Sequence, residues 1–316
     1  FSNLSFWIWV LISKKKSKKI LVSSYLSIIC SLYSAEFFLE KQSKFQKFEF
    51  YLKENKNYDT RSKFEIYNDL KKTEDISPIY YPYNQLLKNR SVKLNKLNNK
   101  KVFLLSSISN KNTITCNESG KYLIYKSDRY GFNNPDKEWL GHKNNNVEYM
   151  LVGDSFTHGA CVNRPNDIGS VLRNLSKKSV LNLGYSGNGP LIEFATLREY
   201  LNNNVKKVLW IYYEGNDLSG LHIEMTDKTL MNYFNDATFT QNLKSKQKEI
   251  DYQAIHYIKK KKSEKGPIEN QRGIFNNELI NFIKITNTRV LIYPPPPLAL
   301  KLKKVLQLAK ELVSKN

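Results

Sequence analysis

Short apolar runs that end in polar, glycine-bearing turns occur three times in the second half of the chain. The runs are Val147 to Val152, Ser179 to Leu183 and Val208 to Tyr213. A strand buried on both faces of a parallel sheet has this continuous apolar pattern. The turns that follow are Gly153-Asp154-Ser155-Phe156-Thr157, Gly184-Tyr185-Ser186-Gly187-Asn188-Gly189-Pro190 and Glu214-Gly215-Asn216-Asp217. Because open α/β sheets bind ligands at the carboxyl ends of their strands, the pattern predicts that the three turns form one site.

Helical periodicity and one further strand complete the predicted elements. A charged, helical insertion covers about 219–275, and it is either a lid over the sheet edge or a solvated helical excursion. A fourth strand is predicted before four consecutive prolines, which cannot continue a hydrogen-bonded ladder. The predicted helices are Leu191 to Leu201, Thr229 to Phe234, Gln241 to Ile250, Tyr252 to Lys262, Asn276 to Ile285 and Leu298 to Val313, and the fourth strand is Thr288 to Tyr293.

Ser155 is the candidate nucleophile, because it lies on the turn that leaves the first strand. The alternative is that Asp154 and Ser155 only cap the following helix, since both residue types are preferred there. A serine that attacks an ester carbonyl creates an oxyanion, which needs donors already in place. The N–H groups of Ser155 and Gly184 and the side-chain amide of Asn216 are the predicted donors.

These three blocks resemble those of the SGNH (GDSL-type) hydrolases, a family named for its Ser, Gly, Asn and His. Gly153-Asp154-Ser155 resembles the first block, Gly184 the second and Gly215-Asn216-Asp217 the third. The resemblance covers about half of the chain, from Val147 onward. It implies an α/β fold, a flavodoxin-like three-layer α/β/α sandwich with a parallel sheet, in which Ser155 is the nucleophile and Gly184 and Asn216 form the oxyanion hole. Gly153, Asp154, Gly215 and Asp217 would support them.

The sequence departs from this family at the catalytic base. The family carries its Asp and His in a late Asp-x-x-His motif, and none follows Asn216. The chain starts at Phe1 and stops at Asn316, so we expect a C-terminally truncated fragment in which the catalytic His and Asp are not present. A serine without its base is a weak nucleophile, and the chain should be nearly inactive.

The four histidines are the other candidates for a base. His158 lies in the first turn of the helix after Ser155, where we expect it to pack beside the site rather than deprotonate the serine. His222 is the best substitute, because it follows Asp217 by five residues. His142 and His256 fall in polar surroundings and are expected at the surface.

The N-terminal part predicts a membrane anchor. Ile20 to Leu39 is long enough to span a bilayer, and lysines precede it from Lys14 to Lys19. Because positive residues stay on the cytoplasmic side, the remainder should be extracytoplasmic, periplasmic or at the cell surface. A signal peptide cut after Ala35 is disfavoured by Tyr33, which stands where a small residue is needed. A buried core helix is disfavoured by the flanking lysines.

The predicted organisation has four parts. A short apolar segment, Phe6 to Ile12, and the basic flank occupy 1–19, and the apolar segment is either the end of an upstream helix or a non-native extension. The anchor covers 20–39, a stalk or accessory region covers 40–146, and the incomplete hydrolase domain covers 147–316.

Composition adds weaker limits. The 50 basic and 29 acidic residues give a net charge of +21, which raises nucleic acid as a partner. The lysines are scattered and lack an accompanying motif, so we expect no nucleic-acid binding. Cys30 falls in the anchor, and Cys116 and Cys161 are expected to be free thiols, although an oxidising compartment would permit a bridge. No cofactor and no metal is expected.

The predicted function is therefore that of a membrane-anchored serine esterase, with an acyl ester as substrate. The first alternative is an O-acetyltransferase of the same fold that modifies a cell-envelope polysaccharide. The second is a membrane-tethered binding module without catalysis.

Overall fold

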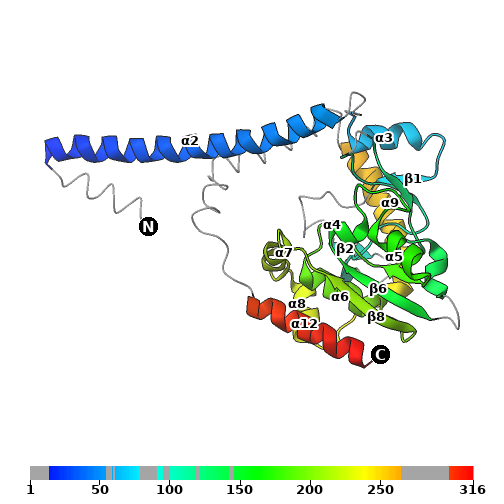
Figure 1. Cartoon of the computed structure of the whole chain (residues 1–316). Coiled ribbons are helices and arrows are strands. Elements are labelled where there is room, and N and C mark those ends of the chain that lie inside the picture. Colours follow the sequence, from blue (N-terminus) through cyan, green and yellow to red (C-terminus); the bar gives the residue numbers. More distant parts are fainter. Residues whose placement is uncertain are drawn as a thin grey trace. The chain divides into compact units, whose positions relative to one another are not determined.

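The chain is a mixed α/β protein with an apolar N-terminal helix (Figure 1). The computed structural model describes residues 14–54, 59, 61–78, 91–94, 100–118, 121–141, 146–264 and 299–315. It divides into two compact units, of which one contains the N-terminal helix and the other contains the sheets. The predicted segments Phe6 to Ile12, Asn276 to Ile285 and Thr288 to Tyr293 lie outside the described residues.

The N-terminal helix α2 spans Lys15–Glu54. Its first 25 residues, Lys15–Leu39, are long and apolar enough to cross a membrane, and almost none of that stretch is buried. At 1.5 Å per residue this stretch reaches about 37 Å, more than the hydrocarbon core of about 30 Å. The predicted anchor at 20–39 thus lies within the helix, which continues past Leu39.

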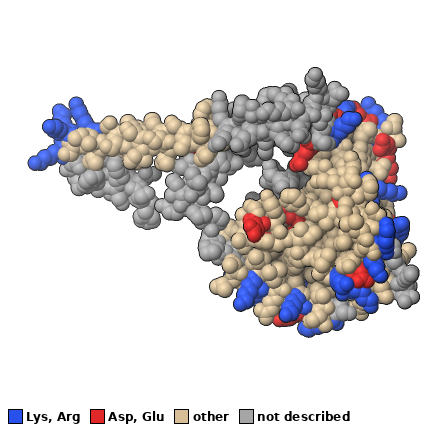
Figure 2. Space-filling model, viewed as in Figure 1, with Lys and Arg blue, Asp and Glu red and all other residues tan. Residues whose placement is uncertain are grey.

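The basic side chains of the described residues are dispersed except at one place. On the face shown in Figure 2, Lys and Arg are interspersed with Asp and Glu over the unit that contains the sheets. They gather at the start of α2, where Lys14 to Lys19 stand. This distribution follows the scatter of lysines along the sequence.

Three parallel strands form the central sheet. They are β6 (Val147–Gly153), β7 (Val180–Asn182) and β8 (Val205–Ile211), in the order β7-β6-β8. Leu151 pairs with Asn182 on one side and with Leu209 on the other. The central residues of β6 are fully buried, as the continuous apolar run predicts. All three predicted strands are confirmed, although β8 begins three residues earlier than expected and ends two earlier.

Helices follow each strand and cover the sheet. α4 (Ser155–His158) and α5 (Ile168–Ser176) lead from β6 to β7, and α6 (Pro190–Tyr200) leads from β7 to β8. Because β7 and β8 lie on opposite sides of β6, right-handed crossovers place α5 and α6 on opposite faces of the sheet. Almost every residue of α6 is buried, since further helices pack against it.

The helices of the predicted insertion are α7 (Asp217–Glu224), α8 (Lys228–Asn235) and α9 (Gln247–Glu264), with a short 3-10 helix, η3 (Lys244–Lys246), between the last two. Leu230 and Tyr233 of α8 and Ile250 and Ala254 of α9 belong to the main hydrophobic core. The insertion is therefore part of the domain core, so the solvated excursion is wrong for these helices. The last helix, α12 (Ala299–Ser314), packs on α6 and matches its predicted position.

The core also extends upstream of the predicted domain start at residue 147. Phe103, Leu105, Ile108 and Phe132 are at most 1% exposed and share one hydrophobic cluster with β6. These residues lie in the range expected to be a stalk or accessory region. Residues 102–108, Phe132 and Trp139 thus contribute to the same core as the strands, and the boundary at 147 does not separate two cores.

A second, small sheet lies in this upstream region. Its strands are β1 (Ile76–Pro78), β4 (Asn112–Ile114) and β5 (Ile124–Lys126), in the order β1-β4-β5. Ile76 and Ile114 pack with Ile66, which precedes β1 in the chain, in a separate hydrophobic cluster. The remaining elements are α3 (Lys63–Leu70), the antiparallel pair β2 (Ser91–Leu94) and β3 (Lys100–Phe103), and the 3-10 helix η1 (Asp136–Leu140).

Candidate active site

Ser155 is the first residue of the four-residue helix α4, directly after strand β6. Asp154 caps this helix, since its Oδ1 accepts a hydrogen bond from the Ser155 N–H. Asp154 thus has the capping role of the alternative interpretation, whereas Ser155 is the first helical residue and its side chain takes no part in the cap. The Ser155 residue is half-buried, and its hydroxyl has no hydrogen-bond partner among the described residues.

Gly153 allows the nucleophile turn to approach strand β8. A Cβ atom at this position would lie 2.7 Å from the carbonyl oxygen of Ile211 and would collide with the Thr157 side chain. Any larger residue would therefore push α4 away from the ends of β6 and β8. This close approach explains the glycine of the first block.

The Asp154 carboxylate joins the three predicted turns. Its Oδ1 also accepts the Gly187 N–H at 2.9 Å, and its Oδ2 accepts Asn216 Nδ2 at 3.0 Å. The side chain is only 2% exposed, so these bonds form away from bulk water. One buried carboxylate thus bonds to all three turns that follow β6, β7 and β8. The turns lie together, as their positions at the carboxyl ends of parallel strands predict.

Gly184 lies in the second turn but directs its N–H elsewhere. That N–H donates to Asn182 Oδ1 at 2.8 Å, and a Cβ atom would lie 2.5 Å from the His158 backbone nitrogen. The glycine therefore permits close packing against α4, whereas Gly187 supplies the N–H that reaches Asp154. The oxyanion role of Gly184 stays a prediction. Sequence reasoning missed Gly187, for which the glycine-rich turn was the available signal, and the structure gives this glycine a positive φ of 81°.

Asn216 occupies the third turn and caps α7. One hydrogen of its carboxamide nitrogen is engaged by Asp154, which leaves the second hydrogen available for an oxyanion. Its Oδ1 is buried without a partner among the described residues. The neighbouring Gly215 is exposed, so the turn itself faces solvent. Asn216 and Ser155 are linked through the Asp154 carboxylate, and the oxyanion role of Asn216 stays a prediction.

Asp217 is the first residue of α7 and is fully buried. Its Oδ2 accepts the Tyr213 N–H at 2.6 Å, and its Oδ1 has no partner among the described residues. Burial raises the pKa of Asp217 to about 6, and the negative charge of Asp154 adds to this rise. Asp217 ends strand β8, because the Tyr213 N–H donates to its carboxylate and not to a neighbouring strand.

Two further buried carboxyl groups near the site were not predicted. Glu193 of α6 accepts a hydrogen bond from Trp210 Nε1. Burial raises the pKa of Glu193 well above its usual range, and the negative charges of Asp217 and Glu224 add a smaller rise. Glu224 accepts the Gly189 N–H at 2.6 Å and the Leu191 N–H at 2.9 Å, at the N-terminus of α6. Their positions in the sequence resemble ordinary helix surfaces, so no local signal marks them.

We expect Asp217→Asn to stabilise the protein at neutral pH. A carboxyl group whose folded pKa is raised contributes stability that is complete below pH 3.8 and is lost as pH rises through about 6. Asparagine keeps an acceptor for the Tyr213 N–H and carries no charge, so the free energy of unfolding at pH 7.5 should rise by about 1 to 2 kcal/mol. Thermal unfolding of the detergent-solubilised chain at pH 5 and pH 7.5 measures this difference.

The control for this variant is Asp236→Asn. Asp236 is exposed, and its bonds to Thr238 lower its pKa, so its contribution has the opposite sign and fades as pH falls. A stability gain for Asp217→Asn that is equal at both pH values would contradict the assignment.

The histidines lie as follows. His158 is 1% exposed, and burial together with the Lys63 ammonium lowers its pKa to about 3. It packs beside the site, as expected, with its ring nitrogens close to Tyr125 and Ser186. That it does not act as the base stays a prediction. His222 is exposed on α7. His142 and the side chain of His256 lie outside the described residues.

Comparison with known proteins adds no family. A scan of protein-family models found no match, and searches of curated proteins and of solved structures found none either.

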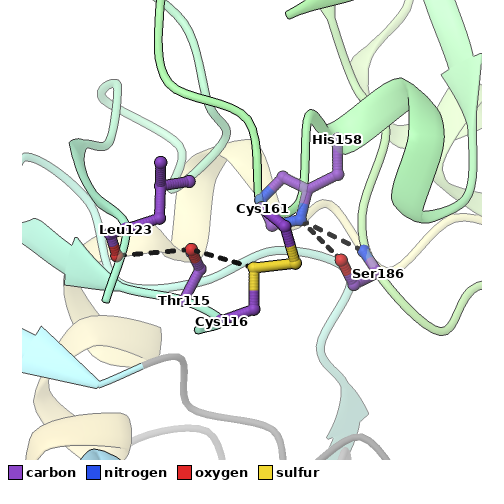
Figure 3. Close-up of a disulfide and its surroundings, with 6 residues drawn as sticks. All are labelled: Thr115, Cys116, Leu123, His158, Cys161 and Ser186. Carbon is purple, nitrogen blue, oxygen red and sulfur yellow. Dashed lines mark hydrogen bonds between the residues drawn. A yellow bond between two sulfur atoms is a disulfide. The ribbon is translucent and has the colours of Figure 1, made fainter. Parts of the chain in front are cut away.

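Cys116 and Cys161 form a disulfide bond, with Cα atoms 5.3 Å apart (Figure 3). The expectation of free thiols is therefore wrong. The spacing in sequence carried no signal, because the pair meets only when the segment after β4 packs beside the loop after α4. Structural disulfides persist in oxidising compartments.

We expect replacement of both cysteines by serine to destabilise the domain. The bridge closes a loop of 45 residues, and loop-closure entropy of that size corresponds to about 3 to 4 kcal/mol of unfolding free energy. Denaturant unfolding of the variant measures the loss. Cys30→Ser is the matched control, because Cys30 is a free, exposed cysteine of α2, and an equal midpoint for all three proteins would contradict a structural role.

Chemically, the site presents a hydroxyl at a helix N-terminus with polar N–H groups on either side. Ser155 supplies the hydroxyl, and Asn216 supplies a donor with an uncommitted hydrogen. Among the described residues, no group of three or more His, Cys, Asp or Glu side chains is arranged to hold a metal ion. The groups present fit nucleophilic attack on a carbonyl and stabilisation of the resulting oxyanion.

Proposed function

We propose that this protein is an SGNH-type serine esterase that cleaves an acyl ester outside the cytoplasmic membrane. The observation that carries the proposal is the convergence of the three motif turns on the Asp154 carboxylate. It brings the Ser155 and Asn216 blocks, separated by about 60 residues in sequence, to one edge of the sheet. The second block joins them through Gly187.

The strand order supports the same proposal. In a flavodoxin-like sheet the order is 2-1-3-4-5, and ligands bind where the order reverses, beside the first strand. The order β7-β6-β8 corresponds to 2-1-3, with β6 as the first strand. Ser155 follows β6 and Asn216 follows β8, so both lie at the reversal. The three-layer sandwich implied by the family resemblance agrees with this arrangement.

The proposed reaction begins with attack of Ser155 Oγ on the ester carbonyl carbon. The negative charge that develops on the carbonyl oxygen is stabilised by the second hydrogen of Asn216 Nδ2, while Asp154 orients that amide. Expulsion of the alcohol leaves an acyl-serine, which water then hydrolyses. We assign the proton of Ser155 to a base outside the described residues, because both ring nitrogens of His158 already contact Tyr125 and Ser186.

The location rests on helix α2. Lysines precede its apolar stretch, and positive residues favour the cytoplasmic side, which supports an extracytoplasmic catalytic unit. The disulfide favours the same side. An ester carried on an envelope polymer is then within reach of the site.

Turnover of an activated acetyl ester tests the proposal. The detergent-solubilised chain is incubated with p-nitrophenyl acetate, with and without imidazole as an added base, and Ser155→Ala serves as the comparison. We expect slow release of nitrophenol and acetate that depends on Ser155 and that imidazole accelerates. Equal rates for both proteins would favour a binding module without catalysis.

The same assay separates hydrolysis from transfer. Oligosaccharides with free hydroxyl groups are added as acceptors beside p-nitrophenyl acetate, and acetate and acetylated sugar are both measured. Free acetate without sugar dependence supports the esterase. Ser155-dependent formation of acetylated sugar without free acetate would instead support an O-acetyltransferase.

A further inference from the structure

His158 has a complete set of partners that the proposed reaction does not use. Its Nε2 lies 3.0 Å from the hydroxyl of Tyr125 on strand β5. Its Nδ1 lies 2.9 Å from Ser186 Oγ and accepts the Ser186 N–H at 3.3 Å (Figure 3). The imidazole thus connects the small sheet, helix α4 and the turn after β7.

Packing holds the plane of this ring. Tyr185 stacks on it at 5.0 Å between centroids and 20° between planes, and Tyr125 meets it edge-on at 5.5 Å and 90°. Because the Ser186 N–H is a donor, Nδ1 must be unprotonated, and the ring hydrogen belongs on Nε2, where Tyr125 Oη accepts it. The geometry therefore assigns one tautomer.

The residues on either side of these contacts belong to the candidate site. His158 closes the same four-residue helix that Ser155 opens. Ser186 immediately precedes Gly187, whose N–H reaches Asp154. A helix of four residues has little stability of its own, so its direction depends on outside contacts.

The C-terminal end of α4 receives two more ties from the upstream region. Asn133 Nδ2 donates to the His158 carbonyl oxygen at 2.9 Å, and Cys161 is bridged to Cys116. The contacts of the imidazole differ from these two, because they also involve the turn that contains Gly187.

We propose that His158 is a positioning residue, which locks the nucleophile helix to the Ser186-Gly187 turn and so sets where the Ser155 and Gly187 N–H groups converge. Its catalytic consequence rests on the proposed esterase function, whereas the positioning itself does not. Tyr125, Tyr185 and Lys63 are the titratable groups near the ring, and burial together with Lys63 keeps it neutral at physiological pH.

Two substitutions separate the contacts of the ring. His158→Asn keeps an acceptor near the position of Nδ1 and so preserves the bonds to Ser186. His158→Gln instead places its amide near Nε2 and preserves only the bond to Tyr125. The proposal predicts that Asn rescues the site and Gln does not, while His158→Ala behaves like Gln.

Hydrogen exchange of the Ser155 and Gly187 amides measures the positioning directly in the full chain. Loss of the Ser186 contact should speed both exchange rates by about tenfold in the Ala and Gln variants, with rates near wild type in the Asn variant. Ile76→Ala is the control for general destabilisation, because Ile76 packs in the separate cluster on the small sheet. Ser186→Ala, which removes the hydroxyl that contacts Nδ1, replaces the His158 variants if they do not fold, and should likewise speed exchange of the two amides.

The outcomes distinguish the two proposals. The exchange pattern without any Ser155-dependent turnover supports the positioning role and overturns the esterase. Turnover that is present while the two amides exchange at the wild-type rate in His158→Ala overturns the positioning role. It is also overturned if nitrogen NMR of labelled histidine shows the hydrogen of His158 on Nδ1, or if Gln rescues the amides as well as Asn does.

Discussion

We expect Asn216→Ala to lower the Ser155-dependent rate of ester turnover by about 10² to 10³, the usual loss for one oxyanion donor. The structure explains the size of the effect, because Asn216 is the donor whose second hydrogen is uncommitted while Asp154 holds its first. The loss should appear in kcat rather than in KM, since the bond to the oxyanion forms only in the transition state. Initial rates with an activated acetyl ester, measured over a range of substrate concentrations, provide both constants.

The matched control is Asn232→Ala. Asn232 is an exposed asparagine of α8, so its loss changes composition equally and leaves the site intact. The free energies of unfolding of the two variants should agree to within the value of one hydrogen bond, about 1 kcal/mol. A rate for Asn216→Ala within twofold of wild type, with Ser155 still required, would refute the oxyanion role.

Asp154→Ala has the largest expected effect on stability. It leaves three donors without their shared acceptor, namely the N–H groups of Ser155 and Gly187 and the amide of Asn216. Each buried donor that loses its partner costs about 1 to 3 kcal/mol, and entry of water offsets part of this. We expect the free energy of unfolding to fall by about 3 to 5 kcal/mol in denaturant titrations.

Asp154→Asn is the informative comparison. Its carboxamide oxygen can still accept the N–H groups of Ser155 and Gly187, and Asn216 can turn its buried Oδ1 toward the new NH₂ group. The loss of stability should therefore be about half of that for alanine. Equal stability of the alanine variant and wild type would mean that Asp154 does not hold the three turns together.

The strands of the central sheet were predictable because buried parallel strands carry unbroken apolar runs. The end of β8 was not, since Tyr212 and Tyr213 continue the apolar pattern. The strand stops at Ile211 because the Tyr213 N–H bonds to Asp217, a contact between residues four apart that no periodicity reveals.

The extent of the core was only partly readable. Leu230, Tyr233 and Phe234 have helical spacing, as do Ile250 and Ala254, so their burial had a signal that the surrounding charges obscured. The run Val102 to Leu105 is short and lies among lysines and asparagines. Its burial depends on packing into the main cluster, in which β3 contacts helix α8, and this is a tertiary contact.

Within the candidate site, the residue types were predictable and the partners were not. Ser155 and Asn216 follow from turn positions and from the family resemblance. The division of tasks between Gly184 and Gly187 depends on which N–H meets Asn182 and which meets Asp154. The disulfide and the contacts of His158 likewise join segments far apart in sequence, whose meeting only the folded chain shows.

Covalent labelling of Ser155 tests the central claim most directly. The full chain, solubilised in detergent and supplied with imidazole, is treated with a fluorophosphonate and then digested for peptide mass spectrometry. The proposal predicts a single modified serine, Ser155, within the peptide that follows strand β6, and no labelling of Ser155→Ala, while the control Ser245→Ala labels like wild type. Labelling that persists in Ser155→Ala, or that maps to another serine, would contradict the account.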